Sequence, residues 1–271
     1  MTKKQFPLTL AIAATTLLAV GTSSAHRLWI LPSTTILSGE NQWVSVEAAI
    51  SNDLFFPNHH ALPLERITAL SPTGKTVELK SAAEGEIRSS FELLLEEQGT
   101  YRITSQMNGM FASWKENGEP KRLRSNEEEL GKMDLSKMEE LKLFKSNTRV
   151  ESIITCGETT EVALKGDGLE FEFITHPNDL FSGETATFRV MLNGKPAAGQ
   201  EITIVKGNDR FRNSVDEMVL TSNDDGIIEI TWTEPGRYWI NGSADLEAGE
   251  FKGLPMKQGA SYTLTVEVLP E

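Results

Sequence analysis

The side chains best suited to chemistry in this sequence are its histidines, His26, His59, His60 and His176. If an export peptidase cuts after Ala25, His26 becomes the first residue of the mature chain. Its α-amino group and its imidazole can then chelate one metal ion together. A third nitrogen, from His59 or His60, would complete a T-shaped site, and nitrogen donors in a tetragonal arrangement favour Cu(II) or Ni(II). The sequence therefore predicts a metal site at His26, with His59 and His60 as candidate partners.

The second half of this predicted site lies in a loop. His59 and His60 end the run 53–60, which follows a segment of alternating apolar and polar residues. Such a loop could return the two imidazoles to the amino terminus. A simpler interpretation stands beside it, because a terminal histidine can be an accident of cleavage and a His-His pair is often a solvated turn. His176 precedes Pro177, so we expect it to end a strand in an extended conformation.

The first 25 residues predict export. Lys3 and Lys4 supply a positive start, residues 6–20 form an apolar stretch shorter than a membrane span, and small residues lead to the predicted cut after Ala25. No cysteine lies near the cut, so we expect no lipid anchor. No later stretch reaches the apolar length of a membrane helix, so we expect no membrane span after signal removal. We expect a periplasmic protein, with secretion as the alternative.

Composition excludes several classes of protein. The chain has 271 residues, with 39 acidic against 26 basic side chains and a formal net charge of −13. Nucleic acid is not an expected partner, because phosphate contacts need a basic face, whereas cations are natural partners of an acidic protein. Cys156 is the single cysteine, which excludes an intrachain disulfide and a cysteine-based zinc site. We expect this thiol to fill the buried face of a strand.

The motifs of common enzymes are missing from the sequence. It contains no Gly-x-Ser-x-Gly elbow, no phosphate-binding glycine loop ending in Lys-Ser or Lys-Thr, no His-Glu-x-x-His and no Cys-x-x-Cys. Its carboxylates are too numerous for a glycosidase pair to be chosen among them. We therefore predict no catalytic residues and no enzyme.

The rest of the chain predicts short strands. Apolar and polar residues alternate in segments that each offer one face to a core, at 42–48, 187–192 and 226–232. Turn-forming residues separate such segments, at 71–74, 192–195 and 223–226. Many short strands between such turns indicate an all-β fold of antiparallel sandwiches.

A weak internal repeat indicates two sandwiches. Ser-Gly-Glu opens a strand pattern at Ser38 and again at Ser182, and a Gly-x-Tyr follows later in each half, ending at Tyr101 and at Tyr238. In immunoglobulin-like sandwiches, a tyrosine at this place closes a corner by hydrogen bonding to nearby backbone. We therefore predict two consecutive Ig-like antiparallel β-sandwich domains. The alternative is that two short motifs recur by chance.

Between the two halves, the alternation gives way to a charge-rich segment. Residues 113–149 combine runs of Lys, Arg and Glu with apolar residues near helical spacing. We predict a short helical insertion here, either a lid or docking hairpin or, more simply, a segment whose apolar stripe covers the edge of a sandwich. The predicted organisation is a signal peptide at 1–25, a first sandwich at 26–112, the charged insertion at 113–149 and an Ig-like second sandwich at 150–271.

Several segments together resemble the DUF4198 family. They are the opening 25–32, the strand pattern 168–173, the His-Pro-Asn-Asp-Leu of 176–180, the turn 193–199 and the segment from 225 to 239. The resemblance implies an exported, NikM-like periplasmic component of nickel or cobalt transport, and it brings no catalytic residues. It also implies that His26 occupies a matching position, within the opening His-x-x-Trp-x-x-Pro.

Three functions are consistent with these observations. The first is a periplasmic metal-handling protein that captures divalent Ni, Co or Cu through His26 for uptake or delivery, with the metal ion and an envelope transport component as partners. The second is a metal-free Ig-like module that binds another protein of the cell envelope. The third is a copper-dependent enzyme that cleaves polysaccharides oxidatively, which also places an amino-terminal histidine on an Ig-like sandwich. We rank the third last, because several tryptophans lie in strand patterns that point to the core.

Overall fold

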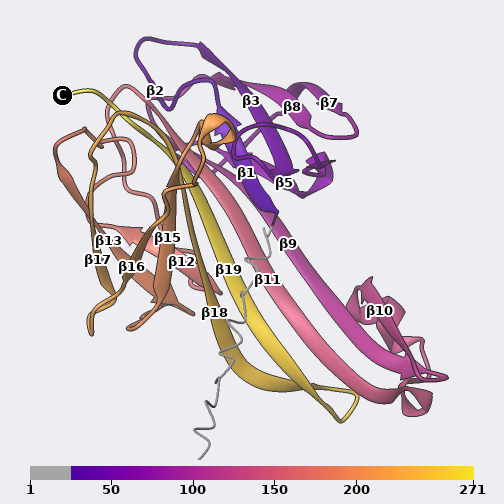
Figure 1. Cartoon of the computed structure of the whole chain (residues 1–271). Helices are drawn as coiled ribbons and strands as arrows, with labels where there is room; N and C mark the ends of the chain where they lie inside the picture. The colour runs from indigo at the N-terminus through magenta and orange to yellow at the C-terminus, as the bar shows by residue number, and fades with distance from the viewer. Residues whose placement is uncertain (1–25) are drawn as a thin grey trace, which may run out of the picture.

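The computed structural model describes residues 26–271, and the predicted signal peptide, 1–25, lies outside the described residues. Most of the described chain is strand, arranged in three sheets (Figure 1). The all-β fold predicted from the sequence is confirmed. The helical elements are short, namely η1 (Leu64–Arg66), α1 (Glu127–Gly131), η2 (Leu135–Lys137) and η3 (Asp209–Phe211). Within residues 26–271, no helix is long and apolar enough to cross a membrane.

The first and third sheets are the smaller ones. The first contains, in spatial order, β1 (Arg27–Pro32), β3 (Gln42–Ser51), β8 (Ser89–Leu95) and β7 (Lys80–Glu84), with β4 (His60–Ala61) also paired to β3. The third contains β12 (Leu169–Phe173), β13 (Thr185–Leu192) and β14 (Lys195–Pro196), with β17 (Ile227–Thr231) also paired to β13.

The central sheet is the largest. Its strands in spatial order are β16 (Met218–Thr221), β15 (Glu201–Lys206), β18 (Gly236–Phe251), β19 (Leu254–Val268), β11 (Glu139–Cys156), β9 (Gly99–Glu116), β5 (Ile67–Leu70) and β6 (Thr76–Val77). Two more join from the side, β10 (Glu119–Ser125) on β9 and β2 (Ile36–Leu37) on β11. The named strands pair antiparallel throughout, except that β11 runs parallel to β19 and to β2.

The central sheet belongs to both sandwiches. One face packs on the first sheet over a core that includes Val46 and Val150, and the other packs on the third sheet over a core that includes Phe188 and Ile153. Neighbouring residues of β11 enter different cores, because successive side chains of a strand point to opposite faces. Every residue from 149 to 156 is accordingly buried. The boundary that the sequence predicts at residue 150 falls inside this shared strand.

A tyrosine closes a corner in each half. The Tyr101 hydroxyl donates to the carbonyl of Glu97 at 2.8 Å, and the Tyr238 hydroxyl donates to the carbonyl of Glu234 at 2.7 Å. Both tyrosines are buried at the start of a long strand. The prediction of two Ig-like sandwiches, each with a tyrosine corner, is confirmed.

Four long strands, β9, β11, β18 and β19, continue beyond the sandwiches as an arm (Figure 1). Within 113–149 the sequence predicts helices, but strands occupy most of that segment, and α1 and η2 are only single turns. The physical reason is that β9 and β11 stay paired as far as Ser113 and Lys142 and resume their pairing at Lys115 and Glu139. Most apolar residues of the segment, including Leu130, pack with this hairpin on one face of the arm.

Candidate metal centre

Two strand pairings at one end of β3 bring the predicted ligands together. β1 pairs with one edge of β3, with Arg27 opposite Ser51, the last residue of β3. β4 pairs with the other edge at the same end, starting at His60. Because both strands run antiparallel to β3, both begin where β3 ends. His26 directly precedes β1, and His59 directly precedes β4.

Hydrogen bonds within the connecting loop fix the path from β3 to His59. The side-chain oxygen of Asn58 accepts from the backbone N–H of Asn52 at 2.8 Å, and its amide donates to the Asp53 carboxylate at 2.8 Å. The Ser51 hydroxyl donates to the Asp53 carbonyl at 2.7 Å. Local side-chain to backbone bonds of this kind define a turn. They hold the two ends of the loop so that His59 arrives beside β1.

Two tryptophans stabilise this end of the first sheet through hydrogen bonds and packing. Trp29 has no exposed surface (0%), and its Nε1–H donates to the Ser51 hydroxyl at 2.7 Å. Trp239 of β18 donates its Nε1–H to the carbonyl of Leu28 at 2.9 Å. Both indoles lie in one small core. The start of β1, and with it the position of His26, is therefore set by packed aromatic side chains.

The three imidazoles form one continuous cluster. The ring centroids of His26 and His59 lie 3.8 Å apart, with the ring planes inclined by 51°. Those of His59 and His60 lie 4.2 Å apart, with the planes at 89°. His59 is in the middle and half-buried, whereas His26 and His60 are exposed. The structure thus places side by side all three histidines that the sequence predicts as ligands.

The environment of His59 favours its neutral form. Burial lowers its pKa below the ordinary value of 6.5, and the neighbouring His26 and His60 lower it further, because a charge on one ring opposes a charge on the next. The Nδ1 atom of His59 is closed off from solvent and has no hydrogen-bond partner among the described residues. A buried polar atom without a partner destabilises the fold unless something binds it. Neutral imidazole is also the form that binds metal ions.

The side chains alone do not complete a metal site. Among residues 26–271, no three His, Cys, Asp or Glu side chains are placed so that they could hold a metal ion together. A site of the predicted kind, however, uses two nitrogen ligands from one residue, the α-amine and the imidazole of His26. This amine is free only after a cut behind Ala25. The packed imidazoles must also rotate to direct their nitrogens at one ion. The donor set therefore fits a site that is assembled on cleavage, from His26 with His59 or His60.

The fourth histidine lies away from the cluster. The Nε2 atom of His176 is 3.2 Å from the Thr100 hydroxyl, and its Nδ1 atom accepts from the backbone N–H of Asn178 at 3.1 Å. It therefore joins the loop after β12 to the start of β9, and burial lowers its pKa. Cys156 is buried in the core of the first sandwich, as the sequence predicts, and burial raises its pKa.

Three supporting residues were not predicted from the sequence. Ser51 and Asn58 carry a local signal, because polar residues that bracket a short loop often bond to its backbone. Trp239 carries none, because it reaches the start of β1 from the far half of the chain. Only the shared central sheet brings it there.

The comparison that identifies the chain is a match to a family described as a domain of unknown function, DUF4198, over residues 23–244. The chain belongs to the DUF4198 family. The segment matched to DUF4198 includes the histidine cluster and most of both sandwiches. No curated protein matches the chain.

The solved structures that are similar to this DUF4198 chain have low sequence identities and low TM-scores. The D0-D1 domain of intimin is 11% identical, covers 89% of this chain and 97% of its own, and has a TM-score of 0.24. Escherichia coli α2-macroglobulin activated by porcine elastase is 13% identical over 90% of this chain and 20% of its own, with a TM-score of 0.22. A DUF4785 family protein from Legionella pneumophila is 9% identical over 79% of this chain and 52% of its own, with a TM-score of 0.25. No functional argument rests on similarities of this size.

Proposed function

We propose that the chain, exported and cut after Ala25, is a periplasmic protein that captures one divalent Ni, Co or Cu ion for uptake or delivery. The observation that supports this proposal is the contact of three imidazoles at the point where the new amino terminus would lie. Imidazole is the commonest metal ligand in proteins. A free amine next to it turns His26 into a bidentate ligand.

The three histidines have different roles in this proposal. His26 supplies its amine and one ring nitrogen, and His59 supplies the third nitrogen, because its ring is the nearer one and its Nδ1 atom has no other partner. His60 is exposed and touches His59. It therefore offers a position through which the ion can enter or leave, for example toward an envelope transport component.

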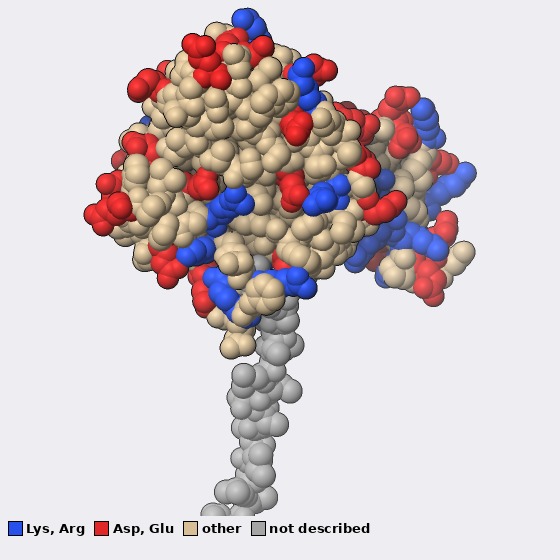
Figure 2. Space-filling model, turned by 90° about the horizontal axis from the view of Figure 1, so that it is seen from above, with Lys and Arg blue, Asp and Glu red and all other residues tan. Residues whose placement is uncertain are grey.

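The charge of the protein favours the capture of cations. The net charge is −13, and Asp and Glu side chains are spread over the face seen from above, interspersed with Lys and Arg (Figure 2). A negative surface potential raises the local concentration of divalent cations and their rate of arrival. It does not select among Ni, Co and Cu, so selection falls to the nitrogen donors.

The test is a calorimetric titration of exported, metal-stripped protein with Cu(II), Ni(II), Co(II) and Zn(II). We expect one ion to bind per chain, with the affinity rising from Co to Ni to Cu, as nitrogen sites generally show. His26→Ala is expected to weaken binding at least about tenfold. His176→Gln is the matched control, because it removes an imidazole outside the cluster, and it is expected to leave the affinity unchanged. Equal affinities for the wild type and His26→Ala would rule out this site.

A further inference from the structure

The two faces of the arm are covered differently. On one face, α1 and η2 pack against the strands over a small core that includes Met110, Leu130 and Leu135. On the other face, a groove with a volume of about 300 Å³ runs over β10, β9, β11 and β19. The aromatic floor of this groove contains Phe144, which is 37% exposed, and Phe111. Large apolar side chains exposed in a concave surface usually mark a place where something binds.

A row of directly opposed residues on four neighbouring strands gives the groove its aromatic and basic character. Arg124 of β10 is opposite Phe111 of β9, Phe111 is opposite Phe144 of β11, and Phe144 is opposite Lys257 of β19. Directly opposed residues share one face of a sheet, so the row has two aromatic rings between two cations. The rings of Phe111 and Phe144 lie 6.1 Å apart, and the Arg124 guanidinium lies 5.5 Å from the Phe111 ring centroid. Neighbouring strands are about 4.8 Å apart, so the row spans about 14 Å.

The groove is basic in an acidic protein. Arg122 and Lys142 stand in an adjacent row, and each is opposite Ser113. With Arg124 and Lys257 they make four exposed cations, and no Asp or Glu lines the groove among the described residues. None of the four forms an ion pair with a described carboxylate, although other lysines of the arm do, in the pairs Lys115–Glu140, Lys132–Glu128 and Lys145–Glu127. Figure 2 shows Lys and Arg side chains on the projecting arm, mixed with Asp and Glu.

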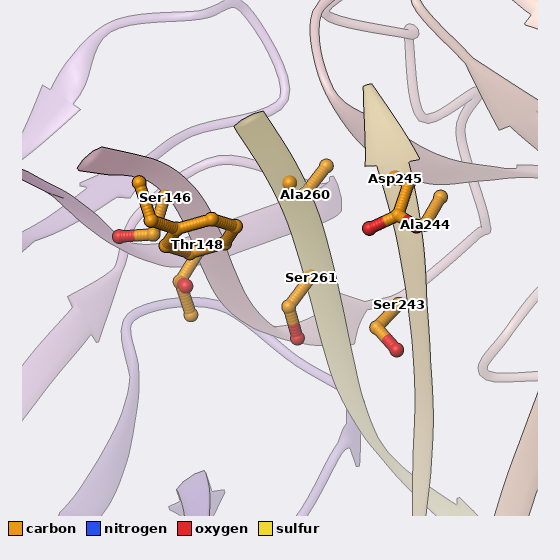
Figure 3. Close-up of a pocket in the computed structure, with 9 residues that line it drawn as sticks. Ser146, Thr148, Ser243, Ala244, Asp245, Ala260 and Ser261 are labelled. Carbon is orange, nitrogen blue, oxygen red and sulfur yellow. The ribbon is translucent and has the colours of Figure 1, made fainter. Parts of the chain in front are cut away.

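The face continues beyond Phe144 into a second shallow cavity of about 430 Å³ (Figure 3). Ser146, Ser261 and Ser243 project into it from β11, β19 and β18, Asp245 of β18 also lines it, and the other side chains around it are mostly small. Small side chains leave room for a backbone, and hydroxyl groups can donate or accept its hydrogen bonds. A chain bound in the groove can therefore extend across this part of the arm.

We propose that this groove binds an extended acidic peptide segment of another protein. The segment would place an aromatic or branched apolar side chain over Phe111 and Phe144, and carboxylates on either side would meet Arg124 and Lys257. An extended chain covers about 14 Å in about four residues, so the two carboxylates belong to residues about four positions apart. The proposal does not depend on the metal site, since none of its residues contacts the histidine cluster.

The shape of the groove favours a peptide over a membrane surface as the occupant. The groove is concave and its aromatic floor is only partly exposed, whereas membrane-bound surfaces insert protruding apolar side chains between lipids.

The test uses the whole mature protein with a metal chelator and fluorescent peptides of about nine residues. The probes carry two Glu four positions apart with Phe, Leu or Tyr between them, and the control peptides carry Gln in place of Glu. Fluorescence anisotropy measures the affinities at physiological salt, where long-range charge effects are screened. We expect micromolar binding of at least one acidic probe and at least about tenfold weaker binding of its Gln counterpart.

Paired variants locate the site. The double variant Arg124→Glu with Lys257→Glu is expected to weaken probe binding at least about tenfold, and Phe144→Ser is expected to weaken it by a similar factor. The double variant Lys132→Glu with Lys137→Glu changes the net charge equally on the other face of the arm, and it is expected to leave the affinity within about twofold. The proposal is overturned if no acidic probe binds, if both double variants weaken binding equally, or if vesicles of anionic phospholipid bind through the groove while the peptides do not.

Discussion

His26 and His59 lie ring against ring, with their centroids 3.8 Å apart, because β1 and β4 begin at the same end of β3 on its two edges. The contact does not depend on any side-chain bond between the two residues. It follows from strand pairing, supported by the hydrogen bonds of Trp29 and Asn58. A cut after Ala25 would therefore create the new amine beside imidazoles that are already in place.

The first prediction separates the two candidate partners of His26. We expect His59→Ala to weaken binding of Ni(II) at least about tenfold, and His60→Ala to weaken it by less. The reason is that the His59 ring contacts His26 directly and has a buried Nδ1 atom without a partner, whereas His60 contacts only His59 within the cluster. Calorimetric titration of both variants checks this order. A larger loss in His60→Ala would assign the third nitrogen to His60 instead.

The second prediction concerns the pH dependence of metal binding. An amine and an imidazole bind a metal only when they are neutral, and their unperturbed pKa values are about 7.7 to 8.0 and about 6.5. We therefore expect the affinity to fall by more than about tenfold between pH 7 and pH 5. Titrations in non-coordinating buffers at both values measure the change. An affinity that stays flat over this range would contradict an amine and imidazole donor set.

The third prediction links His176 to the stability of the fold. Burial lowers the pKa of His176 below 6.5, so at a pH under 6.5 the unfolded chain binds this proton more readily than the folded chain. The contribution of His176 to stability is therefore fully present above its unfolded pKa and is lost as the pH falls through its folded pKa. We expect denaturant unfolding to show a free energy that declines from pH 7 to pH 5, with a shallower decline in His176→Gln. Parallel slopes in the two proteins would refute this assignment.

The fourth prediction tests the tyrosine corners. Tyr238→Phe removes one hydrogen bond to the Glu234 carbonyl, and we expect it to lower the free energy of unfolding by about 1 kcal/mol. Tyr101→Phe is expected to cost more, because the Tyr101 hydroxyl also accepts from the backbone N–H of Glu97 at 2.7 Å. That N–H loses its partner in the variant. Urea unfolding of both variants gives the comparison, and an equal or smaller loss in Tyr101→Phe would show that the second hydrogen bond contributes nothing.

The two sandwiches could be predicted because their signals, strand alternation and the Gly-x-Tyr motifs, are local in the sequence. The alternation around Val44 and Val46 places both side chains in a core, and the Gly-x-Tyr motifs mark both corners. The parallel pairing of β11 with β19 could not be predicted, because it joins residues that are far apart in the sequence, such as Val150 near the middle of the chain and Thr263 near its end. The arm was missed for a related reason. Both faces of its strands carry charged or exposed side chains. The alternation of apolar and polar residues that marks a strand is therefore not visible in the sequence of the arm.

The candidate site could likewise be predicted only in part, from its local residues and not from its long-range contacts. The residue types of His26, His59 and His60 indicate metal chemistry, and the loop after β3 indicates a return toward the amino terminus. Their contact depends on both edges of β3 and on Trp239 from the far half of the chain. The basic groove had only a partial signal in the sequence. Arg122 and Arg124 stand in a visible charged run, but Lys257 joins them only through the central sheet.

The central claim is that cleavage completes a metal site, and one comparison tests it most directly. Protein exported and processed to begin at His26, as verified by intact mass, is titrated with Ni(II) and Cu(II) beside protein that retains Ala25 as its first residue. The two proteins differ by one alanine, which moves the free amine away from His26 without changing any imidazole. We predict one-to-one binding in the micromolar range or tighter when His26 is first, and at least about tenfold weaker binding with Ala25 retained. Equal affinities, or no binding by either protein, would contradict the claim.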